Sequence, residues 1–437
     1  MEWYVATSLV LGSFLGLMLV GVPVVFAFLA TNIVFLYLLM GGEAGLQQLI
    51  LSIYDSLSLF VILPITLFVL MGEVMFRSGM GERMVDALDR WLGKLPGRLG
   101  LLTVFSGAVS AALSGASIGT TAMLGSVMTP QMEKRGYDRR LSLGTVMASG
   151  GLAIMIPPTT LGVILAVLAQ VSVGNFIIAI ILPGLLLASI YAGYVVIRSA
   201  LQPELAPAYD VESVPLGEKI RLTVRYILPL GIVIFLVTVS IFIGVATPTE
   251  AAALGTAGTC LLALAYGRMT KKVFVDSLRE TLRTSVMVLT ILAASQAFSQ
   301  ILAFSGANRH LPELAASLAL APMVQVAAML VVITILGCFL NGVPLMMVTV
   351  PVFMPIVKVL GLDPIWFCVL ILITVEMAQR TPPFGILLFV MKGVGPPGTT
   401  LSQCIAGATP FLICDVFAIA AIMSFPALAL WLPSLMQ

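Results

Sequence analysis

Charged residues are scarce in this sequence. Asp, Glu, Lys and Arg make up 10% of its 437 residues, whereas they make up about 25% of an ordinary soluble domain. This excludes a soluble enzyme and a disordered chain, and a formal net charge of only +2 excludes the basic face of a nucleic-acid-binding protein. Hydrophobic residues account for 60% of the chain, which predicts a protein whose solvent is lipid.

Histidine and paired cysteines are also lacking. The single histidine, His310, cannot form a His-ligated metal site alone, and the five cysteines are scattered without the spacing of a metal-binding motif, which favours a role as small packing residues. The start, Met1-Glu2-Trp3, lacks the basic region of a cleavable signal peptide. We therefore expect the first apolar run to remain as a membrane helix.

Ten apolar stretches are long enough to cross a membrane, since a spanning helix needs about 20 residues. They are residues 3–20, 23–40, 58–77, 141–170, 177–197, 226–245, 250–267, 285–304, 364–391 and 403–432. Pro-Pro pairs interrupt 141–170 and 364–391, and proline breaks a helix because it removes a backbone donor and clashes with the preceding turn. We expect these two helices to break near the middle of the membrane.

Two further apolar stretches, 101–132 and 323–356, are too long for one crossing and carry turn-forming residues at their centres. Each half is also too short to span comfortably, so we expect two re-entrant hairpins that return to the side from which they enter. The stretches 45–57 and 270–284 mix apolar with charged residues and predict amphipathic helices along the two membrane faces.

The distribution of basic residues predicts the orientation. With the N-terminus outside, 19 of the 22 Lys and Arg residues fall inside, as is typical of cytoplasmic loops. Only Arg309 and Lys358 then lie outside, and Arg380 lies within the membrane. The same distribution requires 101–132 to be re-entrant, because the basic loops on its two flanks must share one face. Both termini are expected on the outer face.

The chain repeats itself at a constant offset of 225 residues. Matching residues are Pro157-Pro158 and Pro382-Pro383, Pro130 and Pro355, Gly136 and Gly361, Asp138 and Asp363, Pro23 and Pro248, and Ser52 and Ser277. The loop 133–140 carries four basic residues and its copy 358–363 carries one, so the copies are expected to be inverted. The sequence thus predicts an all-α polytopic membrane protein with two inverted-topology repeats, each of about five crossings and one re-entrant hairpin, the pattern of secondary transporters.

The hairpin tips and helix breaks are the candidate sites for an ion or a substrate. Half-helix N-termini attract anions, and unwound carbonyls with Ser and Thr hydroxyls form a neutral oxygen cage that suits Na⁺. In the first half the candidates are Ser114, Gly115, Ala116, Ser117, Gly151, Ile156, Pro157, Pro158, Thr159 and Thr160. In the second half they are Asn341, Gly342, Met377, Thr381, Pro382, Pro383 and Gly385. The alternative is that Gly and Pro serve here only as turn and kink residues.

Arg380 is the one basic residue predicted within the membrane, where a charge is functional by default. It is a possible contact for a substrate carboxylate. The structural alternative, which we favour, is a pair with Glu376 at the i,i+4 spacing. Glu250 is expected to cap a helix start. Glu73 and Asp415 are expected to make scaffold or subunit contacts, and the alternative is a role in coupling.

Several runs resemble the large membrane (M) subunit of tripartite ATP-independent periplasmic (TRAP) transporters. They are Ser114-Gly115-Ala116-Ser117, Met132 to Asp138, Ile156-Pro157-Pro158, Thr247 to Ala253 and Thr381-Pro382-Pro383-Phe384-Gly385. The resemblance covers essentially the whole chain. Ala116 departs from the Ser-Gly-Ser-Ser often found at the first tip, and the run Gly393 to Gly398 resembles a subgroup associated with keto acids and similar carboxylates.

The resemblance implies a multi-pass permease of a bacterial or archaeal inner membrane, with both termini in the periplasm. It implies Na⁺-driven, elevator-type import of an organic acid, with Na⁺ at the two tips and breaks and no other metal or cofactor. The implied partners are a soluble periplasmic substrate-binding protein (P) and a small four-helix membrane subunit (Q).

The implied division alternates between scaffold and transport domain. Residues 1–100 would be scaffold helices with an arm, 101–176 the first hairpin and broken helix, and 177–322 scaffold helices with a linker and second arm. Residues 323–400 would be the second hairpin and broken helix, and 401–437 a last scaffold helix.

Three other functions are alternatives to a TRAP permease. A stand-alone divalent-anion/sodium symporter shares this architecture, but its Ser-Asn-Thr hairpin signature is absent from the sequence. A membrane enzyme lacks support, because no nucleophile–base set is present. A channel or structural partner fits poorly with two broken helices in an inverted repeat.

Overall fold

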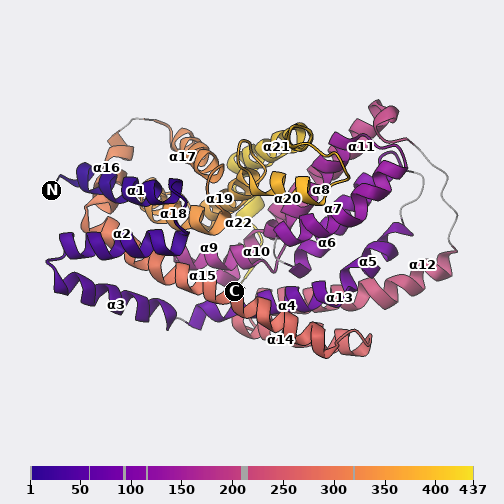
Figure 1. Cartoon of the computed structure of the whole chain (residues 1–437), viewed down its shortest axis with the longest axis horizontal. Helices are drawn as coiled ribbons and strands as arrows, with labels where there is room; N and C mark the ends of the chain where they lie inside the picture. The colour runs from indigo at the N-terminus through magenta and orange to yellow at the C-terminus, as the bar shows by residue number, and fades with distance from the viewer. Residues whose placement is uncertain are drawn as a thin grey trace.

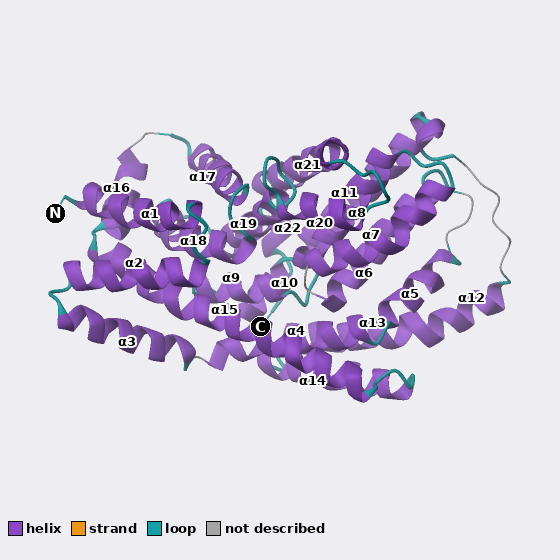
Figure 2. Ribbon diagram, in the orientation of Figure 1, coloured by secondary structure: helices purple, strands orange, loops and turns teal. Residues whose placement is uncertain are grey.

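The protein is a bundle of helices, most of which run along its long axis (Figures 1 and 2). The computed structural model describes residues 2–58, 60–91, 95–114, 117–207, 215–317 and 320–436, and within them every regular element is helical. The first half contains α1 (Trp3–Leu19), α2 (Val24–Leu39), α3 (Glu43–Leu57), α4 (Leu63–Arg77), α5 (Met80–Asp89), α6 (Arg98–Ser114), α7 (Ser117–Lys134), α8 (Arg139–Met155), α9 (Thr160–Leu168), α10 (Val173–Ala179), α11 (Ile181–Leu201) and α12 (Leu216–Leu222). The second half contains α13 (Leu228–Phe242), α14 (Pro248–Ala265), α15 (Lys271–Phe304), α16 (Ala307–Ser317), α17 (Pro322–Gly337), α18 (Gly342–Val359), α19 (Pro364–Ala378), α20 (Ile386–Val394), α21 (Leu401–Ser424) and α22 (Ala427–Leu430).

The apolar stretches of the sequence form helices as predicted. Five helical stretches of the described chain are long and apolar enough to cross a membrane, namely Val173–Leu201, Leu216–Phe242, Lys271–Phe304, Gly342–Val359 and Leu401–Ser424. The pair α8 and α9 is a sixth candidate, bent by 50°. Shorter apolar helices, including α1, α2, α17 and α19, account for other expected crossings, and their total of ten stays a prediction.

Both helices that carry a Pro-Pro pair are interrupted there. The first ends at Met155 and resumes at Thr160, and the second ends at Ala378 and resumes at Ile386. Each lies at the centre of the molecule, because every residue of α8 from 141 to 155 and of α19 from 366 to 378 is buried. A helix apolar on all sides needs such an environment. The first break therefore lies inside protein, where interrupted backbone is tolerated, whereas Pro383 and Phe384 of the second break are exposed.

Each predicted hairpin is a helix–turn–helix unit. α6 and α7 contact each other and pack on α8, and α17 and α18 contact each other and pack on α19. In Figure 1 the first unit lies to the right of the centre and the second to the left. The expectation that each half is too short to cross was wrong for α18, which is long and apolar enough on its own. The return of each hairpin to one membrane face stays a prediction.

One of the two expected surface arms is not a separate element. α3 is a distinct helix after Gly41 and Gly42, both at positive φ, but residues 270–284 continue without a break into 285–304. The resulting α15 has 34 residues, about 50 Å of helix against about 30 Å of hydrocarbon core. The reason is in the sequence, since no Gly or Pro interrupts 271–304.

α11 and α21, both assigned to the scaffold from the sequence, pack against the first broken helix. Both contact α8, they contact each other, and α11 also contacts α6. Gly144 of α8 lies so close to Gly407 of α21 that a Cβ atom at Gly144 would overlap with the Gly407 carbonyl oxygen. Small residues permit such close approach of membrane helices. These contacts join α11 and α21 to the hairpin and broken-helix units.

We expect Gly144→Ala to destabilise the protein. The added methyl meets backbone rather than a flexible side chain, so it should cost about 1–3 kcal/mol of unfolding free energy. Gly193→Ala in α11 is the matched control, because nothing lies within 4 Å of its added Cβ, and it should be neutral or slightly stabilising. Thermal unfolding of the purified variants in detergent measures both. Equal stability of the two variants would contradict the close contact of α8 with α21.

Candidate functional site

The two hairpin tips and the two helix breaks open onto one cavity of about 610 Å³. Four segments line it from the hairpin and broken-helix units, namely Ser117–Gly119 of α7, Thr160, Leu161 and Ile164 of α9, Asn341–Pro344 at α18, and Gln379 after α19. The opposite wall comes from α2, α4 and α15 through Pro23–Val25, Val69, Gly72, Glu73, Phe76, Arg77, Glu280, Thr284, Met287, Val288 and Ile291. This volume suits a small organic ligand.

Four of the residues predicted from the sequence line this cavity directly, and they are Ser117, Thr160, Asn341 and Gly342. Gly115 and Ala116 lie outside the described residues, and Ser114 is the last residue of α6. The other predicted site residues lie in the helix breaks or behind them. The wall that sequence reasoning missed includes Glu280, Thr284, Met287 and Ile291. Their spacing of three or four residues places them on one face of α15, a signal that the sequence does contain.

The first break is held by buried residues. Ile156 ends α8 in an extended conformation, and Pro157, Pro158 and Thr159 are the residues between the helices. Pro157, Pro158 and Thr159 are buried, and the Thr159 hydroxyl accepts a hydrogen bond from the Gly162 N–H at 3.4 Å. Thr159 thus caps α9, whereas Thr160 faces the cavity.

The second break satisfies its freed backbone groups within a few residues. The Thr381 hydroxyl donates to the Met377 carbonyl at 2.8 Å, and the Leu387 N–H donates to the Gln379 carbonyl at 2.9 Å. Gly385 lies so close to the backbone of residues 379 and 381 that any Cβ would fall 2.7–2.9 Å from it. Pro382 accepts a hydrogen bond from the Cys338 thiol at 3.4 Å, which joins the end of α17 to the break.

The tips meet helices of both halves. A Cβ atom at Gly342 would lie 3.2–3.5 Å from Val375, Gln379 and Leu161, so the second tip contacts its own broken helix and α9 of the other half. At the first tip, where Gly115 and Ala116 lie outside the described residues, Ser117 contacts Glu376 of α19, whose Oε2 accepts from the Ser117 hydroxyl at 2.9 Å.

Arg380 lies in a fully buried charge cluster behind the cavity. Its Nη2 donates to both carboxylate oxygens of Asp415 at 2.7 and 2.8 Å and to the Tyr191 hydroxyl, which in turn donates to Asp415. The expected i,i+4 pair with Glu376 is also present but longer, with Oε1 at 3.9 Å from Nη1. Sequence spacing missed Asp415 because it is 35 residues away on α21. The guanidinium does not line the cavity, which favours a structural role over a substrate contact.

Gly151 explains how this cluster fits against α8. A Cβ atom there would overlap with Glu376 Oε1 and lie 2.8 Å from Arg380 Nη1. Only glycine lets the α8 backbone pass this close to two charged side chains. Met147 of α8 offers its carbonyl to Arg380 Nη1 at 3.5 Å.

Two other acids singled out from the sequence, Glu73 and Glu250, have local partners. Glu73 pairs with Arg77 at 2.8 Å on the cavity wall. Glu250 accepts from the Thr247 N–H at 2.8 Å and forms a capping box at the start of α14, as expected from the sequence. No group of three His, Cys, Asp or Glu residues in the described part of the chain is arranged for a metal ion.

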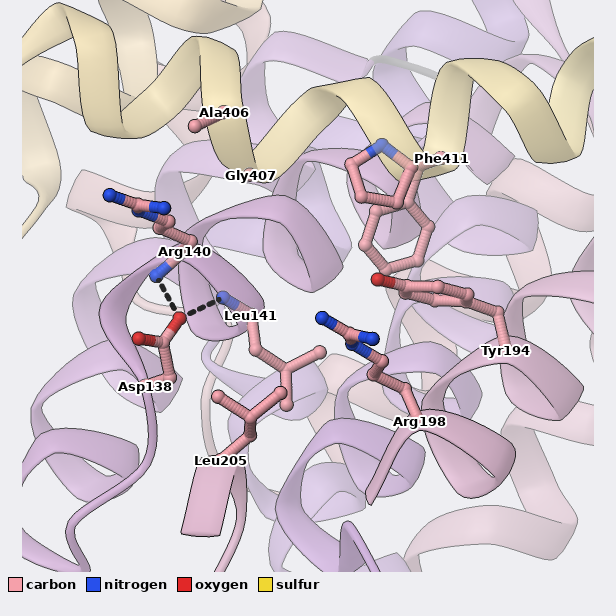
Figure 3. Close-up of a pocket in the computed structure, with 10 residues that line it drawn as sticks. Asp138, Arg140, Leu141, Tyr194, Arg198, Leu205, Ala406, Gly407 and Phe411 are labelled. Atoms are coloured by element: carbon pink, nitrogen blue, oxygen red, sulfur yellow. Dashed lines mark hydrogen bonds between the residues drawn. The ribbon is translucent and has the colours of Figure 1, made fainter. Parts of the chain in front are cut away.

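A second cavity, of about 220 Å³, lies between the start of α8 and the helices α11 and α21. Asp138 turns back here to accept from the N–H groups of Arg140 and Leu141 at 2.9 and 3.1 Å, so it caps α8. In Figure 3 the guanidinium groups of Arg140 and Arg198 are well separated and do not converge on one point. We therefore take the larger cavity as the functional site.

We expect Asp415→Asn to lower the unfolding free energy by about 3–5 kcal/mol, because it leaves Arg380 buried without its main counter-ion. Glu133→Gln is the control, since it removes one carboxylate from an exposed pair with Arg139, worth at most about 1 kcal/mol. Denaturant unfolding compares the two. Arg380→Lys completes the test, because a structural Arg380 leaves the substrate concentration for half-maximal uptake unchanged, whereas a substrate contact does not.

Comparisons with known proteins identify the family of this chain. The family described as tripartite ATP-independent periplasmic transporter, DctM component, matches residues 11–428. The C4-dicarboxylate TRAP transporter large permease protein DctM of Pseudomonas aeruginosa is 29% identical over 91% of this chain and 92% of its own length. The ectoine TRAP transporter large permease protein TeaC of Halomonas elongata is 26% identical over 98% and 99%.

The fold is also found among solved structures. The YdaH transporter of Alcanivorax borkumensis superposes with a TM-score of 0.64 over 87% of this chain and 88% of its own, at 16% identity. This likeness shows a shared membrane-transporter fold. The family match covers nearly the whole sequence. This chain therefore belongs to the DctM family of TRAP transporter large permease subunits and is a transporter component, not an enzyme.

Proposed function

We propose that this chain imports an organic acid across the inner membrane in a sodium-coupled cycle. The observation that carries the proposal is the single cavity shared by both hairpin tips and both helix breaks. Two discontinuous helices that meet at one central site are the arrangement of secondary transporters.

Sodium is proposed as the coupling ion because the oxygens at the tips are neutral. Ser117, Thr160 and Asn341 line the cavity, and the buried hydroxyls of Ser106, Ser110 and Thr121 in the first hairpin have no hydrogen-bond partner among the described residues. Hydroxyls and unwound carbonyls together replace the hydration shell of Na⁺ without a full counter-charge.

The moving unit is proposed to be larger than the sequence suggested. Arg380 joins α19 to α21 and α11, and the contact of Gly144 with Gly407 joins α8 to α21. Breaking a buried ion pair in every cycle would be costly. We therefore place α11 and α21 with the hairpins and broken helices as one elevator, which slides against α2, α4 and α15.

A carboxylate substrate is proposed to bind in the cavity. α18 starts there, and its N-cap residue Asn341 makes no side-chain cap, so the positive end of this helix dipole is directed at the site. The only described cation on the wall, Arg77, already pairs with Glu73. The TRAP relatives are named for different substrates, so the acid is identified only as a small carboxylate.

The proposed partners rest on the family resemblance, and the proposed orientation rests on the distribution of basic residues. We propose a periplasmic binding protein that delivers the substrate, a small membrane subunit that braces the scaffold, and both termini in the periplasm. The second candidate is a stand-alone sodium symporter, which would need no binding protein.

We expect uptake of labelled C4-dicarboxylates or 2-keto acids to require both an inward Na⁺ gradient and the binding protein. The measurement uses proteoliposomes that contain this chain with its small subunit. Thr160→Val and Asn341→Ala should lower uptake at limiting Na⁺ or substrate by about tenfold or more, which is the effect of about 1.4 kcal/mol. Ser126→Ala should not, because this exposed hydroxyl bonds only its own helix. Equal uptake without a Na⁺ gradient would refute sodium coupling, and uptake without the binding protein would favour the stand-alone symporter.

A further inference from the structure

Glu376 connects the two halves of the site through one hydrogen bond. It lies on α19, one turn before the second break, and its Oε2 accepts from Ser117, the first residue of α7 at the first tip. Both residues are buried, since Glu376 has no exposed surface and Ser117 is 3% exposed. The two residues are 259 positions apart in the chain, so a side-chain contact joins one tip to the broken helix of the other half.

This hydrogen bond fixes the polarity of the Ser117 hydroxyl. A serine hydroxyl has one proton and two acceptor lone pairs. We take Glu376 as ionised beside Arg380, and an ionised carboxylate can only accept, so Ser117 gives its proton to Glu376 and keeps both lone pairs for another partner. Ser117 lies on the cavity wall, where those lone pairs are the part of the group that a cation needs.

The position of Glu376 is itself determined by its neighbours. Its Oε1 lies 3.9 Å from Arg380 Nη1 and has no hydrogen-bond partner among the described residues. On the other side it meets the α8 backbone at Gly151, and Arg380 is held by Asp415 and Tyr191. Arg380 thus faces two carboxylates, and only Asp415 binds it closely. Glu376 Oε2 is therefore available to accept the hydrogen bond from Ser117.

We propose that Glu376 is a positioning residue for sodium, which orients the Ser117 hydroxyl as a cation acceptor and couples the first tip to the second broken helix. It does not touch the ion. The proposal rests on the sodium coupling proposed above. Residues that orient ligands in this way change metal affinity by about 10- to 100-fold when they are mutated.

The test measures Na⁺ binding without a substrate. A ligand that binds only the folded state stabilises it by RT ln(1 + L/Kd), where L is the free ligand concentration. Thermal unfolding of the purified complex is therefore followed against NaCl, with choline chloride holding ionic strength constant, and the dependence gives the Kd for Na⁺. For Glu376→Gln we expect this Kd to rise by about tenfold or more, because an amide can donate to Ser117 and occupy a lone pair.

Three further variants keep the test decisive. Glu376→Asp retains the buried charge beside Arg380 but is one methylene too short for Ser117, and it should weaken Na⁺ binding similarly. Ser117→Ala combined with Glu376→Gln should bind Na⁺ no more weakly than Ser117→Ala alone, because both act through one contact. Glu133→Gln, which removes an exposed carboxylate at the far end of α7, should leave the Na⁺ dependence unchanged.

The outcomes separate the two proposals. If Glu376→Asp or Glu376→Gln keeps the Na⁺ dependence of the original chain, or if their effects add fully to that of Ser117→Ala, the positioning role of Glu376 is wrong. If the unsubstituted chain itself shows no stabilisation specific to Na⁺, sodium coupling fails instead, and the role of Glu376 fails with it.

Discussion

A backbone that is interrupted inside a lipid-facing protein must find hydrogen-bond partners within the protein, because the bilayer core offers none. The two broken helices of this chain meet that constraint in different ways. At the first break, Thr159 supplies its hydroxyl as a cap. At the second, carbonyls of residues 377 and 379 take the freed donors, and Gly385 lets the chain fold back on itself. The first break is enclosed by the rest of the bundle, whereas Pro383 and Phe384 of the second break reach the surface.

Charge is subject to the same constraint. The centre of the molecule contains one arginine and two carboxylates without exposure to solvent, and a buried ion is tolerated only with good partners. Asp415 and Tyr191 are the close hydrogen-bond partners of Arg380, whereas one oxygen of Glu376 accepts from Ser117 and the other has no donor among the described residues. This unequal distribution separates a structural ion pair from a carboxylate that contacts the cavity wall only through Ser117.

Much of this architecture could be predicted from the sequence, because the signals are local. Pro157-Pro158 and Pro382-Pro383 mark the two breaks, and turn residues such as Asn341-Gly342 mark a hairpin tip. The partner of Arg380 could not be predicted in this way, since Glu376 has the right spacing along one helix while Asp415 comes from another. The packing of α11 and α21 against α8 depends on tertiary contacts, and their own sequences resemble any apolar crossing. The continuity of α15 was readable from the lack of Gly and Pro, but its change from charged to apolar residues suggested two elements.

The close approach of Gly144 to Gly407 has a mechanical consequence. Where two helices touch through side chains, small displacements are absorbed by rotamer changes, and the joint between them is compliant. Two glycines have no rotamers, so a push on α8 is transmitted to α21 through the peptide backbone itself, as expected in an interior of low compressibility.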